Sequence, residues 1–226
     1  MHKPGGKTKG SSKGRIFPPI ERADAEGILA VSRDLNEEML LEAYSSGIFP
    51  WPFDNSCVLW FAPQTRAVLD FAEFKASKKL MRELRSKNFT LEHDRRFKAV
   101  IENCASQPRP GQEGTWITPK IINAYCQLHR CGLARSFETI GPDGELAGGL
   151  YGVQIGHYFS GESMFHKSSD ASKFALVGLV EFLKEQGLTW LDAQVMTPLL
   201  ASFGAKEISR DEYMRRLKSD CFIPQN

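Results

Sequence analysis

The chain has 226 residues, of which 42% are hydrophobic and 25% are charged, and its formal net charge is +2. These values are ordinary for a globular protein, and the length allows one large domain with a smaller appendage. No apolar run approaches the ~20 residues that a membrane span requires, and the low net charge argues against a strongly basic nucleic-acid coat.

Residues 1–15 read "MHKPGGKTKGSSKGR", which places five basic side chains among glycines and serines. No apolar segment follows, so the pattern is not that of a secretory signal. We expect a disordered basic tail over residues 1–15. A weak arm that binds a polyanion is the alternative, because each Lys or Arg near a phosphate adds salt-sensitive affinity.

The next segments alternate between helical and extended patterns. Residues 34–46 place apolar side chains on one helical face before Gly47, which predicts a short amphipathic helix. "GIFPWPF" (47–53) is too rich in proline for a helix or a central strand, so we expect a rigid exposed turn. Strand-like pieces flank Pro63, residues 77–87 read as a basic amphipathic helix, and residues 94–106 help to close an N-terminal region.

The segment 113–132 carries the clearest helix signature, with Thr118 as N-cap, Pro119 at the first helical position and Gly132 as terminator. Three strand-like pieces follow, "LARSFETI", "LAGGLYGVQIG" and "HYFSGESMF", joined tightly enough for an antiparallel meander. An amphipathic helix, the apolar strand "LTWLDAQV", a helix start at Thr197 and a capping box at Ser209 complete the order.

This order predicts the α/β (α+β) class, with a mixed, mostly antiparallel sheet flanked by helices. We expect a small N-terminal domain over residues 16–72 and a larger domain over residues 73–226. Acetyl-CoA-dependent N-acetyltransferases share the order, but they carry a glycine-containing pyrophosphate loop where this chain has "FHKSSDASK". A transferred group is therefore not expected to arrive on coenzyme A.

Three polar residues stand among apolar neighbours: Glu162 in "SGESMF", and Asp192 and Gln194 in "WLDAQV". An unpaired buried carboxylate costs several kcal/mol, so something positive or polar should meet Glu162. Residues two apart in a strand share a face, which places Asp192 and Gln194 together. They either satisfy neighbouring backbone groups or orient and deprotonate an attacking amine, and spacing alone does not decide between these roles.

Trp51 and Trp116 both lie in connecting segments. One such ring more often plugs a domain junction, but two make stacking on a nucleobase competitive. Basic residues between 78 and 87 either contact a phosphate backbone or form a solvated helix face.

The five cysteines form no Cys-x-x-Cys pair, which indicates a reducing compartment. The histidines lack metal-ligand spacing, so we expect no metal.

Six stretches in this order resemble the leucyl/phenylalanyl-tRNA protein transferases, from about residue 17 to residue 217. They are "EAYSSGIFPW", "WFAPQTRAVL", "EGTWIT" with "AYCQLH", "GGLYGVQIG", "FSGESMF" with "ASKFAL", and "LDAQ" with "LASFGAKEISRDEY". The resemblance implies transfer of Leu or Phe, with Met as a further donor, from the tRNA ester to the α-amine of proteins that begin with Arg or Lys. This modification marks the protein for degradation (N-end rule). It also implies a small N-terminal domain before an N-acetyltransferase-like domain, a cytoplasmic location, no membrane association and no cofactor.

The resemblance also implies roles for particular residues. Trp51 and Trp116 resemble the pair that holds the terminal adenosine, and Asp192 and Gln194 resemble the pair that positions and activates the amine. Glu162 resembles the site carboxylate, whose expected partner is a cationic ligand. The positions that match the pocket for the donor side chain are Leu150, Phe159 and Leu179.

Several residues depart from the family pattern. Ser32 and Arg33 replace two glycines, Arg135 and Leu199 stand where histidine is usual, and Leu150 and Leu179 replace longer or aromatic side chains. We expect the absence of the two histidines to affect the surroundings of Asp192 and the choice of acceptor. The alternatives are therefore the same chemistry with altered donor or acceptor specificity, and a non-catalytic relative that binds tRNA or N-terminal peptides. The absence of a self-complementary apolar stripe predicts a monomer.

Overall fold

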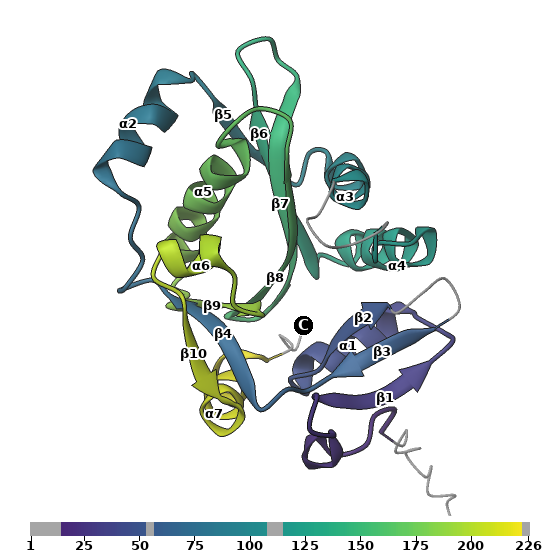
Figure 1. Ribbon diagram of the computed structural model, residues 1–226. Coiled ribbons are helices and arrows are strands. Elements are labelled where there is room, and N and C mark those ends of the chain that lie inside the picture. Colours follow the sequence, from purple (N-terminus) through teal and green to yellow (C-terminus); the bar gives the residue numbers. More distant parts are fainter. Residues whose placement is uncertain (1–14, 53–56, 108–114, 223–226) are drawn as a thin grey trace, which may run out of the picture.

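The computed structural model describes residues 15–52, 57–107 and 115–222, so most of the predicted basic tail lies outside them. The short 3-10 helix Ile20–Arg22 precedes the first strand (Figure 1). The helices are α1 (Glu37–Ser45), α2 (Lys78–Ser86), α3 (Phe97–Ser106), α4 (Pro119–Arg130), α5 (Ala171–Glu185), α6 (Pro198–Ser202) and α7 (Arg210–Asp220). The strands are β1 (Ile28–Ser32), β2 (Phe49–Pro52), β3 (Val58–Phe61), β4 (Thr65–Asp70), β5 (Thr90–His93), β6 (Ala134–Ile140), β7 (Leu146–Ile155), β8 (Tyr158–His166), β9 (Trp190–Gln194) and β10 (Lys206–Ser209).

A small antiparallel sheet with the order β1-β3-β2 forms the N-terminal part. The rigid exposed turn predicted for residues 47–53 is wrong: Phe49–Pro52 is strand β2, and Ile48, Phe49 and Pro50 are buried. Proline fits here because β2 is an edge strand, where backbone N–H groups on the outer side have no ladder partner to lose. The edge position leaves Trp51 beside the larger domain.

The larger sheet has seven strands in the order β10-β4-β9-β8-β7-β6-β5. The meander β6-β7-β8 is antiparallel as predicted, and the pairing of β8 with β9 is the parallel one. Strand β4 pairs with β9 and β10, so the change from the small sheet to the large one falls between Phe61 and Thr65, whereas the predicted domain boundary is at residue 72.

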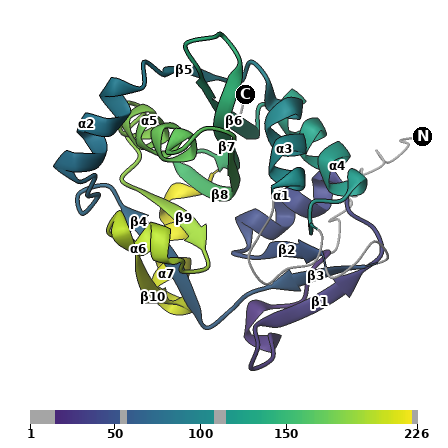
Figure 2. The same ribbon diagram turned by 45° about the horizontal axis from the view of Figure 1, so that its top comes forward.

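Helices cover both faces of the larger sheet. Helix α5 lies on one face, and α3 and α4 lie on the other (Figures 1 and 2). Residues 94–106 are expected to close the N-terminal region, but α3 packs mainly on β7 and β8. Two hydrophobic clusters result, one under α5 and one that joins α1, α3 and α4 to the small sheet. The second cluster fixes the small sheet against the large one.

The predicted helix starts and stops are confirmed at α4. The side chain of Thr118 accepts the backbone N–H of Ile121, and Pro119 occupies the first turn. Gly132 ends the segment with φ +74°, a conformation that glycine adopts without steric cost. None of the helices in the described part of the chain is long and apolar enough to cross a membrane.

Candidate active site

Glu162 lies in the middle of β8, half-buried, and its partners are polar but uncharged. Gln194 Nε2 and Ser160 Oγ donate to Oε1 at 2.7 and 3.2 Å, and Tyr125 Oη donates to Oε2 at 3.1 Å. Burial raises the pKa of Glu162, hydrogen bonds from Tyr44 and Tyr125 lower it, and the charge of Asp192 raises it, which gives about 7. The carboxyl therefore changes charge near neutral pH.

Asp192 is fully buried and paired with Arg66, a residue that the sequence analysis missed. Arg66 donates from Nε at 2.9 Å to Oδ1 and from Nη2 at 2.7 Å to Oδ2, and Tyr158 and Tyr213 donate to Oδ2 at 2.7 and 3.0 Å. Burial acts to lower the pKa of Arg66, but the Asp192 carboxylate outweighs it and the pKa is raised. Asp192 thus satisfies the expectation that a buried carboxylate has partners.

Gln194 ends β9 in a strained turn. Its φ is +61°, and the N–H of Val195 donates to the carbonyl of Ala193 at 2.7 Å across it, as in the rare γ-turn with positive φ. Asp192 Oδ1 accepts the backbone N–H of Gln194 at 2.8 Å and so supports the turn. The side chain of Gln194 consequently reaches Glu162 on the neighbouring strand.

These groups border a cavity of about 520 Å³. Strands β8 and β9 pair at Ser160–Asp192, and residues that follow this pair on both strands, among them Glu162 and Gln194, line the cavity. Its volume is within the ~300–1,000 Å³ typical of small-ligand sites. The lining residues are Pro50, Trp51, Trp116, Leu150, Tyr151, Gly161, Glu162, Ser163, Met164, Leu176, Leu179, Leu191, Ala193, Gln194, Val195, Thr197, Leu199 and Leu200. The cavity therefore joins the small sheet, the acidic group on β8 and an apolar wall.

Trp51 and Trp116 stand together at one side of this cavity. Their ring centroids are 6.1 Å apart with an interplanar angle of 17°, and both rings are half-buried. Trp51 comes from β2 and Trp116 from the segment before α4, so the fold brings together two indoles that the sequence separates widely.

Two of the three residues predicted for the donor pocket line this cavity. Leu150 and Leu179 line the cavity, but Phe159 does not, because it is fully buried and packs on Phe137 behind the wall. The apolar lining residues that the sequence analysis missed include Met164, Leu176, Leu191 and Leu200. A helical stripe in α5 was the available signal for Leu176, since it lies one turn before Leu179.

The two departures from histidine fall in different places. Leu199 lines the cavity. The expectation that Arg135 affects the surroundings of Asp192 is wrong: its Nη2 pairs with Asp94 at 2.6 Å and its guanidinium lies over the Phe182 ring at 4.9 Å. Of the two, Leu199 is thus the departure that a ligand in the cavity would meet.

Known proteins are similar in sequence to this chain over most of its length. Family models described as "Leucyl/phenylalanyl-tRNA protein transferase" and its N-terminal domain match residues 68–218 and 33–64. A protein from Flavobacterium johnsoniae named leucyl/phenylalanyl-tRNA–protein transferase is 47% identical over 207 residues, 92% of this chain and 97% of the relative. One of the same name from Chromobacterium violaceum is 48% identical over 212 residues, 93% of this chain and 90% of the relative.

The chain belongs to the leucyl/phenylalanyl-tRNA protein transferase family. Among solved structures, the crystal structure of FemX matches with a TM-score of 0.52 and 11% identity, and covers 76% of this chain and 66% of FemX. This likeness concerns the fold. It agrees with the predicted α/β class and with a sheet flanked by helices on both faces.

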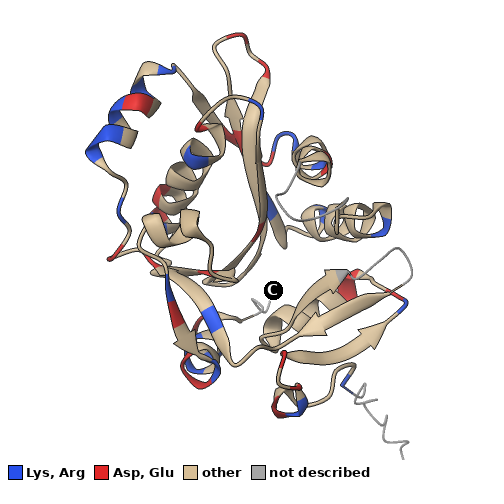
Figure 3. Ribbon diagram, viewed as in Figure 1, with Lys and Arg blue, Asp and Glu red and all other residues tan. Residues whose placement is uncertain are grey.

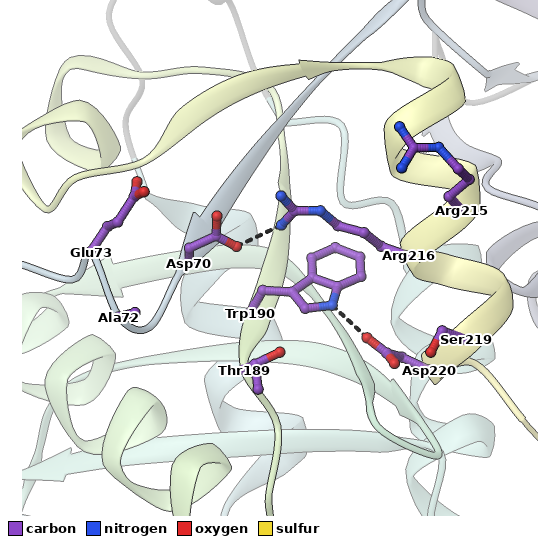
Figure 4. Close-up of a pocket in the computed structure, with 9 residues that line it drawn as sticks. All are labelled: Asp70, Ala72, Glu73, Thr189, Trp190, Arg215, Arg216, Ser219 and Asp220. Carbon is purple, nitrogen blue, oxygen red and sulfur yellow. Dashed lines mark hydrogen bonds and ion pairs between the residues drawn. The ribbon is translucent and has the colours of Figure 1, made fainter.

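A second cavity, of about 490 Å³, lies between β4, β9 and α7 (Figure 4). Its charged side chains pair with each other or with close neighbours: Arg216 contacts Asp70 at 2.6 Å, and Trp190 Nε1 donates to Asp220 at 2.6 Å. This mutual pairing favours the cavity beside Glu162 as the family's candidate active site. Within the described ranges, no three His, Cys, Asp or Glu side chains gather as metal ligands.

Proposed function

We propose that the chain transfers leucine or phenylalanine, with methionine as a further donor, from its tRNA ester to the α-amine of proteins that begin with Arg or Lys. The product would carry a new N-terminal residue that marks it for degradation, in the cytoplasm, where the chain would act as a monomer. The observation that carries this proposal is one cavity that combines an aromatic pair, an apolar wall and the polar pair Glu162 and Gln194. The ester supplies the free energy of transfer.

The indoles of Trp51 and Trp116 offer a stacking surface for the terminal adenine. Stacking on an aromatic side chain is worth about 1–3 kcal/mol per base. Two rings that hold a base on both faces need centroids about 7 Å apart, twice the usual contact distance. At 6.1 Å, a base that enters between them would move the rings apart by roughly 1 Å.

The apolar wall would hold the side chain of the donor amino acid. Leu150, Leu179 and their neighbours present aliphatic groups without hydrogen-bonding partners for a polar side chain. Such a wall selects by size and apolarity, with about 1–3 kcal/mol for each methylene. Leu199, which lines the cavity where histidine is usual in the family, favours a donor or acceptor specificity that differs from the family's. Transfer assays with a panel of donors and acceptors would reveal this difference.

Gln194 would orient the attacking amine, and Asp192 would act through it. Gln194 Nε2 is already engaged by Glu162 and Ser160, so its amide oxygen is the atom left to accept from an amine. Asp192 is absent from the cavity lining and has 0% exposure. We therefore assign Asp192 to the support of the γ-turn at Gln194 instead of direct proton transfer.

Helix α2 would contact the tRNA backbone. Figure 3 shows Lys and Arg gathered along α2, and Lys78, Lys79, Arg82 and Arg85 are exposed. Such contacts position nucleic acid without reading its sequence. Residues 1–15 would add to this contact if the tail is a polyanion-binding arm.

The test is transfer of labelled amino acid from total aminoacyl-tRNA to peptides that differ in their first residue. We expect label from leucine and phenylalanine on peptides that begin with Arg or Lys, and weaker donor binding in Trp51→Ala and Trp116→Ala. Label from another amino acid, or on another N-terminus, would show altered specificity. No label on any peptide, with tRNA still bound, would overturn the proposed enzymatic activity and favour a non-catalytic relative that binds tRNA.

A further inference from the structure

Two carboxylates lie on the neighbouring strands β8 and β9, and they differ in access to the cavity. Asp192 has 0% exposure, pairs with Arg66 and receives further hydrogen bonds from Tyr158 and Tyr213. Glu162 lines the cavity and has no ion pair with any described residue. An attacking amine can therefore reach Glu162 but not Asp192.

Glu162 is held by a chain of neutral hydroxyl groups that starts in the small N-terminal part. Tyr44 of α1 and Tyr125 of α4 lie with their hydroxyl oxygens 2.5 Å apart, and Tyr125 donates to Glu162 at 3.1 Å. Both tyrosines have 0% exposure, and burial raises their pKa further, so they remain protonated donors. The chain joins α1, α4 and β8 at one carboxyl group.

We propose that Glu162 is the general base and acid of the transfer, and that Tyr125 and Tyr44 are its positioning residues; the proposal rests on the proposed function. The acceptor amine enters uncharged, and its nitrogen forms a bond to the ester carbonyl carbon. Glu162 takes one proton from that nitrogen. The bond from carbon to the ribose oxygen then breaks, and Glu162 gives the proton to this oxygen, which leaves an amide, a ribose hydroxyl and the original carboxylate.

The electrostatic surroundings suit both halves of this cycle. A group that accepts and returns a proton works best with a pKa near the working pH. Burial raises the pKa of Glu162 to about 7 against the lowering effect of its hydroxyl donors. The titratable groups that face it are Tyr44 on α1, Tyr125 on α4 and Asp192 on β9, and Arg66 on β4 neutralises Asp192. No cation among the described residues holds Glu162 in its charged form.

The chain offers a matched control for a substitution at Glu162. Glu138 on β6 is also a glutamate in a Ser-x-Glu stretch, with Ser136 Oγ donating to Oε1 at 2.6 Å, as Ser160 donates to Glu162 at 3.2 Å. Glu138 is fully buried and does not line the cavity. Glu138→Gln therefore repeats the chemical change outside the site.

The experiment measures single-turnover transfer of phenylalanine from its tRNA to an Arg-initiated peptide between about pH 5.5 and 8.5, with correction for ester hydrolysis. We expect Glu162→Gln to lower the rate at neutral pH by about 100- to 10,000-fold without weakening donor binding. In a plot of transfer rate against pH, the rise near pH 7 should disappear in this variant and remain in Glu138→Gln. The rise near pH 8 that comes from the peptide amine should stay in both variants.

A second pair of variants tests the positioning role. Tyr125→Phe removes a hydrogen bond that lowers the pKa of Glu162, so the rise near pH 7 should move to higher pH while the rate at high pH is retained; Tyr44→Phe should move it in the same direction. A rate that falls equally at every pH would overturn the role of the tyrosines. Transfer by Glu162→Gln at the wild-type rate would overturn the role of Glu162 as general base while the proposed function stands. No transfer by the wild-type protein would overturn both the role of Glu162 and the proposed function.

Discussion

Replacing Asp192 by Asn tests whether this carboxylate acts in structure or in chemistry. The change nearly keeps the side-chain volume but removes the charge that faces Arg66, whose side chain is 2% exposed. Removal of one partner from a buried ion pair costs about 3–5 kcal/mol, because the other charge stays buried without compensation. At about 2–4 °C per kcal/mol for a chain of this size, the melting temperature should fall by roughly 6–20 °C.

Urea and thermal denaturation measure this loss, and Asp70→Asn is the control. Asp70 also pairs with arginine, at 2.6 Å from Arg216, but its side chain is 19% exposed and it contacts Lys206 as well. We expect the control to lose about 1 kcal/mol or less. The folded fraction of Asp192→Asn should retain transfer within about tenfold, because Asn still accepts the N–H of Gln194. Wild-type stability together with abolished transfer would refute the structural role.

Three further predictions concern Glu162, the donor wall and the binding of tRNA. The rise in the pKa of Glu162 from 4.5 to about 7 means that the folded protein binds this proton more tightly than the unfolded chain. Between these pH values the free energy of unfolding, measured by urea denaturation, should therefore fall with rising pH by up to roughly 3 kcal/mol relative to Glu162→Gln. The same pH dependence in both proteins would contradict this. Leu150→Phe should lower kcat/KM for phenylalanyl-tRNA about 10- to 200-fold and for leucyl-tRNA less, and an equal loss for both donors would argue against selection by size. Arg82→Ala, Arg85→Ala and deletion of residues 1–14 should each make the salt dependence of tRNA binding shallower, by about 0.7–0.9 in slope for each phosphate that the protein no longer neutralises, whereas Arg215→Ala on α7 should leave it unchanged.

Local patterns predicted the elements well where the chain signals its own boundaries. The N-cap at Thr118 and the terminator at Gly132 define α4, and they depend on backbone groups only a few residues away. The prediction at residues 47–53 was wrong because proline content alone does not show that an edge strand is available. The strand β10 also went unpredicted, since its four residues gain their structure from the pairing with β4.

The sequence by itself determined the family, much of the order of helices and strands, and the polar and indole candidates of the site, because periodicity, caps and the six stretches are readable along the chain. Only the tertiary structure decided which side chains meet. Arg66 and Asp192 are 126 positions apart, and Tyr44 and Tyr125 are 81 apart. A buried carboxylate requires compensating partners, but no local pattern says which distant residue supplies them. The fold places Arg66 beside Asp192, and Glu162 is the carboxyl group that lines the cavity.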